Sequence, residues 1–184
     1  MGNSLPMQPT SGDLIQFSQS ISGGITSTAL EQWSGSFEDL CEYLSSPQIV
    51  NSKFDADYYV RAIGDYRNDK SLSNHASLLI LDGDSHIDEN GEVISGSPSL
   101  QLIHEALARH HVQHIIHTTY SHTLEVNKCR VIIPCEYSRE QLLALVDSFI
   151  ALLHSEGVML APVKENYAWA QPWFRPSADK SGGQ

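Results

Sequence analysis

The sequence predicts an α+β protein whose core has the element order βαββαβ, and three observations lead to this prediction. Strand-like and helix-like segments alternate in that order from residue 77 onward. The strand-like segments are short, apolar and rich in β-branched residues. The helical segments repeat their apolar residues every three or four positions. We therefore expect an antiparallel or mixed sheet with two helices on one face, as in ferredoxin-like and RNA-recognition-like folds.

Two segments precede this core. Residues 1–28 are polar and rich in Ser and Gly, so we expect a mostly irregular segment with one short strand over residues 13–21. Residues 29–76 are expected to form a small αβ appendage. Within it, apolar residues at helical spacing predict a helix over residues 29–46, and residues 58–64 predict a short strand.

The core is expected to span residues 77–176. Its strands are predicted over residues 77–82, 112–120 and 128–135, followed by a strand-like apolar and aromatic tail. Pro134 is expected to end the third strand, because proline has no N–H to donate to a neighbouring strand. Residues 177–184 are expected to be a flexible tail.

Two helices are predicted within the core. The first runs over residues 97–111, with Ser97 as its N-cap. The second runs over residues 138–157, where Ser138 and Gln141 have the spacing of a capping box. The apolar stripe of the second helix consists of Leu142, Leu145, Val146, Phe149 and Leu153.

The composition narrows the functional classes. The chain carries 22 acidic and 11 basic residues, a formal net charge of −11, which argues against broad, sequence-independent binding to nucleic acid. A local basic site is compatible with this charge. The three cysteines lack CxxC spacing, so we expect free thiols, with Cys129 and Cys135 buried in a strand. We recognise neither a signal peptide nor a membrane-spanning segment, so we expect a cytoplasmic protein without a membrane partner.

The most informative motif lies at the end of the first core strand, where an apolar run leads directly into Asp82-Gly83-Asp84. Residues two apart in a strand point to the same side, so a strand that continues through Asp84 projects both carboxylates together. Mg²⁺ and Mn²⁺ prefer oxygen ligands, and Mg²⁺ usually takes one or two carboxylates completed by water and phosphate. His86 is a candidate outer ligand. The alternative is that Asp-Gly-Asp is only a turn that ends the strand.

A second polar segment, HTTYSHT over residues 117–123, joins two predicted strands, and the second of these carries Lys128 and Arg130. Hydroxyl, imidazole and guanidinium groups together suit the oxygens of a triphosphate. A βαββ order places its first and third strands side by side, which brings Arg130 to Asp82 with His122 nearby. Such a set suits a nucleoside triphosphate bound with a metal ion. The alternative is a polar hairpin whose side chains bond the local backbone.

Four segments occur in an order typical of a known family: LLILDGD, HTTYSHT, KCRVIIP and NYAWAQPWFRP. Together they resemble the primase-polymerase domains of plasmid- and phage-encoded replication proteins, within the archaeo-eukaryotic primase superfamily. The resemblance covers roughly residues 55–176. It implies a core related to the RNA-recognition fold and metal-dependent nucleotidyl transfer that makes primers or extends DNA. The implied ligands are Mg²⁺ or Mn²⁺, nucleoside triphosphates and a DNA template, and the implied partner is a replicative helicase or initiator.

The resemblance also implies which residues hold the metal ions. Asp82 and Asp84 match the two acidic positions of the family motif. The family places a third acidic residue late in the core, about where this chain has Ala161. Glu165 is the only acidic residue close by, so either Glu165 serves as the third ligand or the site has only two carboxylates.

The nucleotide contacts follow from the same comparison. His122 is expected to contact the phosphates of the incoming nucleotide, and the residues expected beside it are Ser121, Lys128 and Arg130. The expected base or template contacts are Tyr120, Gln171 and Trp173. The tail also offers Tyr167, Trp169 and Phe174 as rings that stack on bases, or that pack against the core instead.

Two other functional classes stay open. An apolar strand followed by Asp-x-Asp also occurs in haloacid-dehalogenase-like phosphatases, in which the first Asp is a nucleophile. That class requires a parallel α/β sheet and a late acidic pair, and this sequence has no such pair. The other class is a primase-like module of weak or absent catalytic activity that binds DNA or a replication partner.

Overall fold

The computed structural model describes residues 14–84, 88–90, 92, 99–160 and 163–180. These residues form an α+β protein with two four-stranded antiparallel sheets, a two-stranded parallel sheet and three α-helices. The helices are α1 (Phe37–Ser45), α2 (Leu100–Arg109) and α3 (Leu142–Ser155). The α+β class predicted from the sequence is therefore confirmed.

The central sheet contains, in order, β5 (Ala62–Gly64), β6 (Leu72–Asp84), β8 (Lys128–Ser138) and β7 (Ile115–Thr118). Each strand is antiparallel to its neighbours. The strand predicted over residues 77–82 is confirmed as part of β6, which extends beyond it in both directions. The two long strands β6 and β8 lie in the middle of this sheet and determine where the ends of the predicted motifs meet.

The second sheet contains, in order, β2 (Leu30–Gly35), β1 (Ile15–Ser20), β4 (Tyr58–Val60) and β9 (Trp173–Phe174). The two-stranded sheet pairs β3 (Gln48–Val50) with β10 (Ser177–Asp179). The short strand predicted over residues 13–21 is β1. The tail expected from residue 177 begins instead with strand β10, which is held by its parallel pairing with β3.

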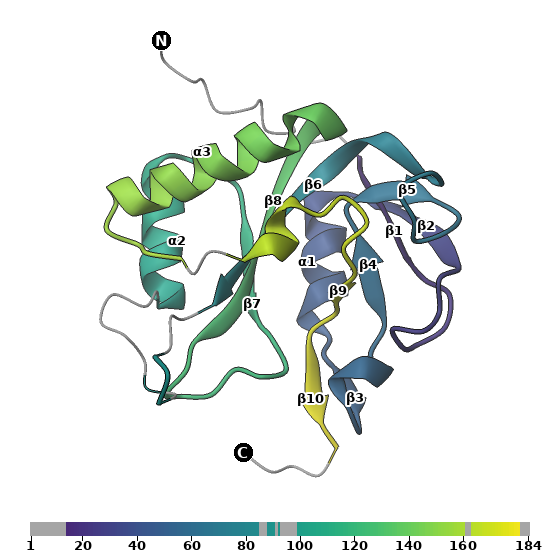
Figure 1. Ribbon diagram of the computed structural model, residues 1–184, viewed down its shortest axis with the longest axis horizontal. Helices are drawn as coiled ribbons and strands as arrows, with labels where there is room; N and C mark the ends of the chain where they lie inside the picture. Colours follow the sequence, from purple (N-terminus) through teal and green to yellow (C-terminus); the bar gives the residue numbers. More distant parts are fainter. Residues whose placement is uncertain (1–13, 85–87, 91, 93–98, 161–162, 181–184) are drawn as a thin grey trace.

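The central sheet is buried on both faces because successive residues of a strand point to opposite sides. Leu79 and Leu81 of β6 pack with α2 and α3, whereas Leu78 and Ile80 pack with β1, α1 and Trp173. Figure 1 shows α2 and α3 on one side of β6 and β8, and α1 with the second sheet on the other. The molecule therefore has a helical layer, the central sheet, and a layer made by the N-terminal residues and the C-terminal tail.

The last strand of the predicted βαββαβ core does not take its expected place in the described part of the chain. The tail contributes only β9, and β9 pairs with β4 in the second sheet. The edge position beside β6 is taken by β5, which precedes β6 in the chain. Periodicity correctly indicated the order of five core elements, but it could not show that a residue range assigned to the appendage completes the sheet.

The helix predicted over residues 29–46 is wrong in its first part, which forms strand β2. β2 pairs with β1 along its whole length, and Trp33 stacks on Phe17 of β1 with ring centroids 4.6 Å apart. The helix α1 begins only after Ser36, whose side chain accepts the backbone N–H of Asp39 in a capping box. The apolar residues that looked like one helical stripe belong to two elements, because strand pairing outweighs local spacing here.

Strand β8 continues through Pro134 to Ser138, so the prediction that Pro134 ends the strand is wrong. β7 pairs with β8 only as far as Ile132, and the register of β6 against β8 shifts next to Pro134, between Ala76 and Leu78. Edges and bulges are the places where a sheet tolerates proline, because no ladder hydrogen bond is lost there.

The two helices predicted within the core are present with small shifts. Ser99, not Ser97, caps α2 by accepting the backbone N–H of Leu102, and Ser97 lies outside the described residues. The capping box of Ser138 and Gln141 is present, but it opens a 3₁₀ turn, η2 (Arg139–Gln141), that leads into α3. The five residues predicted as the apolar stripe of α3 are all buried.

Candidate functional site

The central strands bring the two predicted motifs together. In the register of β6 and β8, Asp82 lies opposite Arg130 and Asp84 lies opposite Lys128. All four side chains belong to the sheet face that is turned away from α2 and α3, because the residues between them face the helical layer. Gly83 is one of these intervening residues. A Cβ added at Gly83 would lie 2.6 Å from the sulfur of Cys129, so a larger residue there would require the Cys129 side chain to move.

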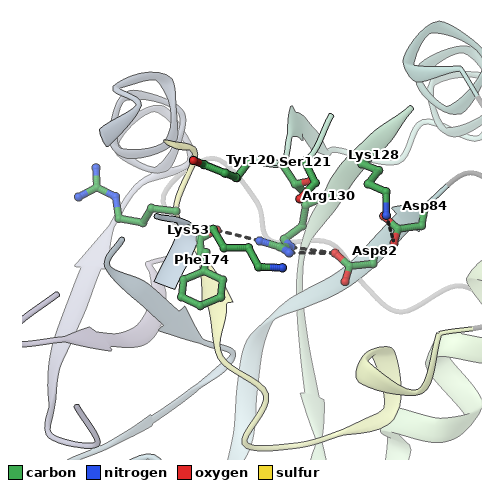
Figure 2. Close-up of a pocket in the computed structure, with 10 residues that line it drawn as sticks. Lys53, Asp82, Asp84, Tyr120, Ser121, Lys128, Arg130 and Phe174 are labelled. Atoms are coloured by element: carbon green, nitrogen blue, oxygen red, sulfur yellow. Dashed lines mark hydrogen bonds and ion pairs between the residues drawn. The ribbon is translucent and has the colours of Figure 1, made fainter. Parts of the chain in front are cut away.

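Two ion pairs connect the strand ends. The Nε and Nη2 atoms of Arg130 each lie 3.0 Å from Oδ1 of Asp82, and the Nζ atom of Lys128 lies 3.5 Å from Oδ2 of Asp84. Arg130 also donates from Nη1 to the backbone oxygen of Phe174 at 2.8 Å. The Arg130 guanidinium therefore joins the acidic strand end to the C-terminal tail, as the dashed lines in Figure 2 show.

A cavity of about 160 Å³ opens above these pairs. Its lining residues are Lys53, Asp82, Asp84, Thr119, Tyr120, Ser121, Lys128, Arg130, Phe174 and Arg175. Four of the chain's 11 basic residues line this cavity with two carboxylates, although the whole chain has a net charge of −11. Such a local excess of positive charge attracts anions and makes phosphate groups the best-matched ligands.

Burial and neighbouring charges both act on the acidic strand end. Burial raises the pKa of Asp82; Arg130 opposes this shift, while the charges of Asp84 and Glu165 add to it. Burial alone would lower the pKa of Arg130, but the Asp82 carboxylate and the Tyr59 hydroxyl together outweigh burial and raise it. Burial also raises the pKa of the Cys129 thiol to about 12, so this thiol stays protonated at neutral pH. Arg130 is thus a permanent cation next to a carboxylate that burial destabilises in its charged form.

Asn166 is a structural residue of this site that the sequence interpretation missed. Its side-chain oxygen accepts the backbone N–H of Asp82 at 2.8 Å, and its backbone oxygen accepts a hydrogen bond from Nη2 of Arg61 at 3.2 Å. Asn166 and Arg61 are both fully buried. Asn166 lies on the 3₁₀ turn η3 (Lys164–Tyr167). It provides a hydrogen-bond acceptor for a backbone N–H of β6 at a point where β6 is no longer paired with β5. Nothing in the local sequence distinguishes this asparagine from a solvent-exposed one.

The structure brings most of the predicted nucleotide contacts to one place. Ser121, Lys128 and Arg130 line the cavity, as does Tyr120. His122 is not among the lining residues, and its Nδ1 accepts the backbone N–H of Lys128 at 3.2 Å. His122 therefore supports the strand that carries Lys128 and Arg130.

Other predicted site residues lie apart from the cavity. Gln171 lines a separate hollow of about 670 Å³, together with Arg139 and Trp169. Trp173 is fully buried, with its ring centroid 4.9 Å from the Arg130 guanidinium carbon, so no base can reach the ring in this structure. Trp169 is also buried against the core. His86 lies outside the described residues.

The sequence interpretation did not assign four of the lining residues. Thr119 lies within the HTTYSHT segment, and Phe174 was considered only as one of several aromatic rings. Lys53 lies on the 3₁₀ turn η1 (Lys53–Asp55), and Arg175 follows β9. Lys53 and Arg175 reach the cavity only because the N-terminal layer and the tail fold over the central sheet, which no local pattern reveals.

The carboxylates of Asp82 and Asp84 are the candidate metal ligands among the residues that line the cavity. No three His, Cys, Asp or Glu side chains gather there in a way that could hold one ion. Glu165 does not line the cavity, although its charge acts on Asp82. Two adjacent carboxylates beside cations fit a Mg²⁺ or Mn²⁺ ion whose other ligands are water and the phosphates of a substrate.

The comparisons with known proteins add no relative. The chain matches no protein-family model, no curated protein and no solved structure. Among the described helices, none combines the length and apolar character needed to cross a bilayer. The three cysteines are free, and Cys129 and Cys135 are buried as predicted.

Proposed function

We propose that this chain is a metal-dependent nucleotidyltransferase of the primase-polymerase type, which joins nucleotides on a DNA template. The observation that carries this proposal is the cavity in which Asp82 and Asp84 share one sheet face with Arg130 and Lys128. Carboxylates for a divalent ion and cations for phosphate oxygens are the two groups that phosphoryl and nucleotidyl transfer require. The order of the sequence motifs, shared with primase-polymerase domains, supports the same conclusion.

In the proposed reaction a 3′ hydroxyl gives its proton to water and its oxygen attacks the α-phosphorus of a nucleoside triphosphate, and the bond to the oxygen that bridges to the β-phosphate breaks, releasing pyrophosphate. Asp82 and Asp84 would hold the Mg²⁺ or Mn²⁺ ion, which neutralises phosphate charge and polarises the phosphoryl group when bound. Arg130 and Lys128 bind phosphate oxygens. We expect Arg130 and Lys128 to exchange their carboxylate partners for these oxygens when the nucleotide enters.

A second candidate function is nucleotide binding without turnover. The observation in its favour is that Glu165, the candidate third carboxylate, does not line the cavity with Asp82 and Asp84. The phosphatase alternative has less support, because β6 is antiparallel to both of its neighbours, whereas that class requires a parallel sheet. As a primase-polymerase the chain would take a DNA template, and a replicative helicase or initiator is the partner we propose for it.

The decisive experiment measures primer synthesis and primer extension by the purified chain with Mg²⁺ or Mn²⁺. We expect template-directed incorporation by the wild type and at least a hundredfold loss in Asp82→Asn and Asp84→Asn. The matched control is Asp69→Asn, because Asp69 is also paired with an arginine, Arg139 at 2.8 Å, but lies outside the cavity. Metal-dependent nucleotide binding without any incorporation by the wild type would reject the polymerase proposal in favour of the binding module.

A further inference from the structure

We propose that Phe54, together with Phe174, forms the surface on which the base of the bound nucleotide stacks. This inference rests on the proposed function, because it assumes that the triphosphate lies on the cations of the cavity. It assigns a role to Phe54, which is not part of any motif in the sequence.

The cavity has two chemically different ends. Asp82, Asp84 and Lys128 lie at one end, and Phe174, Lys53 and Tyr120 lie at the other, as Figure 2 shows. Arg130 lies between them and bonds to both, to Asp82 through Nε and Nη2 and to the backbone oxygen of Phe174 through Nη1. A ligand whose phosphates occupy the charged end therefore has aromatic side chains on the other side of the Arg130 guanidinium.

The aromatic end continues out of the cavity through Phe54. The rings of Phe54 and Phe174 meet edge to face with centroids 6.1 Å apart. Phe54 is 52% exposed although it is a large apolar side chain. Single exposed apolar residues are common, but this one extends the wall of a cavity. Phe54 is therefore an exposed aromatic ring in direct contact with a residue that lines the cavity.

The backbone holds Phe54 in place. Its N–H donates to the side-chain oxygen of Ser52 at 3.3 Å, and its carbonyl accepts the N–H of Ile25 at 3.0 Å. The ammonium of Lys53 lies 5.0 Å from the centre of the Phe54 ring. A ring on an anchored backbone loses little conformational freedom when a ligand stacks on it, which favours binding.

The size of the cavity requires that part of a nucleotide lie outside it. Its volume of about 160 Å³ is well below the 300–1,000 Å³ of typical sites that enclose a small-molecule ligand. The phosphates belong at the charged end, so the nucleoside extends in the opposite direction. That side carries the ring of Phe174, which contacts the ring of Phe54. Aromatic rings give a base a face to stack on, which the charged end does not offer.

A ring surface of this kind does not select a particular base. Stacking uses the face that every base possesses, whereas discrimination requires hydrogen bonds to the base edges. We therefore infer that the Phe54 surface supports all four bases to a similar extent. This tolerance is what template copying needs, because base pairing with the template then chooses the nucleotide.

The test compares two kinds of ligand that both carry a triphosphate, of which only one carries a base. Dissociation constants are measured by titration calorimetry with Mn²⁺ for each of the four nucleoside triphosphates and for inorganic tripolyphosphate. We expect Phe54→Ala to weaken all four nucleotides about tenfold, which is the scale of one stacked base, and to leave tripolyphosphate binding unchanged. Phe54→Trp should restore nucleotide affinity. The matched control is Tyr66→Ala, which removes a similarly exposed aromatic ring (54%) away from the cavity.

The outcomes separate this inference from the proposed function. If the wild type binds both ligand types and Phe54→Ala leaves nucleotide affinity unchanged, the stacking inference is rejected and the phosphate site stands. Equal weakening of nucleotides and tripolyphosphate in Phe54→Ala would also reject it, because the base would then not be the group that the ring contacts. If the wild type binds neither ligand, the proposed function falls and the inference falls with it.

Discussion

The two faces of the β6–β8 strand pair carry opposite kinds of residue within the same short stretch. On the face covered by α2 and α3, Leu81 and Val131 continue the apolar core almost to the ends of the strands. On the other face Ile80 is the last apolar residue of β6, and Asp82 and Asp84 follow it. The same strand end can therefore bury apolar side chains on one face and present a charged site on the other, because the side-chain direction alternates with every residue.

The two faces also differ in what covers them. The helical face is covered by amphipathic helices that follow β6 and β8 in the chain. The charged face is covered by Lys53 on η1 and by Phe174 and Arg175 in the tail, segments more than 100 residues apart. A helix with a continuous apolar stripe seals the core against water, whereas these separate segments leave an opening lined by polar groups. The predictions below test this contrast, beginning with the largest expected effect.

Shortening a buried side chain on the helical face should cause the largest loss of stability. Leu81 is fully buried between the sheet and the helices, so Leu81→Ala is expected to lower the free energy of unfolding by about 4 kcal/mol through lost burial and the cavity left behind. Urea denaturation followed by circular dichroism measures this change. The control Leu143→Ala removes a leucine that is 61% exposed on α3 and should cost less than about 0.5 kcal/mol. A loss of less than 1 kcal/mol in Leu81→Ala would show that this face is not closely packed.

Removing the cation of the charged face should have the next largest effect. Arg130→Met is expected to lower the free energy of unfolding by about 3 kcal/mol, because it leaves the Asp82 carboxylate buried without its cation. Arg139→Met is the control, since the Arg139–Asp69 pair is largely exposed and should contribute less than about 1 kcal/mol.

A double variant tests whether the unpaired Asp82 carboxylate causes the loss of stability in Arg130→Met. Adding Asp82→Asn to Arg130→Met should restore part of the lost stability, because no unpaired charge then remains in the site. Equal losses in the single and double variants would mean that Arg130 acts through its contacts with Phe174 and Trp173 rather than through the ion pair.

The imidazole of His117 should make the stability of the protein depend on pH. His117 of β7 lies opposite Arg130, and burial together with the Arg130 charge lowers the pKa of His117 to about 4. The unfolded chain binds this proton near pH 6.5, so between pH 6.5 and pH 4 the unfolded state holds more protons and stability falls as pH falls. From pH 7 to pH 5 the wild type should lose about 2 kcal/mol more than His117→Gln.

Denaturation at the two pH values measures this difference, and His75→Gln is the matched control because His75 is exposed on β6. The His75 variant should lose as much stability as the wild type between pH 7 and pH 5. If His117→Gln loses as much as the wild type too, the imidazole of His117 is not held neutral by the charged face.

Some features of both faces could be predicted from the sequence. The Asp82–Arg130 pairing was predictable because an apolar run ending in Asp-Gly-Asp and the βαββ order together determine which strand ends meet. The buried stripe of α3 was predictable for a local reason, because its apolar residues lie within one helix and repeat at helical spacing.

What could not be predicted depends on distant segments. Periodicity does not show that β5 rather than the tail borders β6, and the apolar spacing of residues 29–46 fits one helix as well as a strand followed by a helix. Lys53 and Asn166 carry no local signal: Lys53 lines the cavity together with residues far away in the sequence, and Asn166 accepts a hydrogen bond from Asp82 of the distant strand β6. The residues of the cavity that the sequence did not predict are mainly those supplied by the N-terminal layer and the C-terminal tail.

The smallest expected change in stability comes from Asp84→Asn. Asp84 and Lys128 are each about 30% exposed and their charged atoms lie 3.5 Å apart, so losing this pair should change the free energy of unfolding by less than about 0.5 kcal/mol. The same variant should abolish the thermal stabilisation by ATP with Mn²⁺ that we expect of the wild type, because one of the two metal-binding carboxylates is gone. Leu81→Ala, three residues earlier in β6, should behave in the opposite way, with low stability and normal ligand-dependent stabilisation of the folded protein. If Asp84→Asn kept the ligand effect, the charged face would bind nucleotide through its cations alone and the carboxylates would serve only to hold those cations in place.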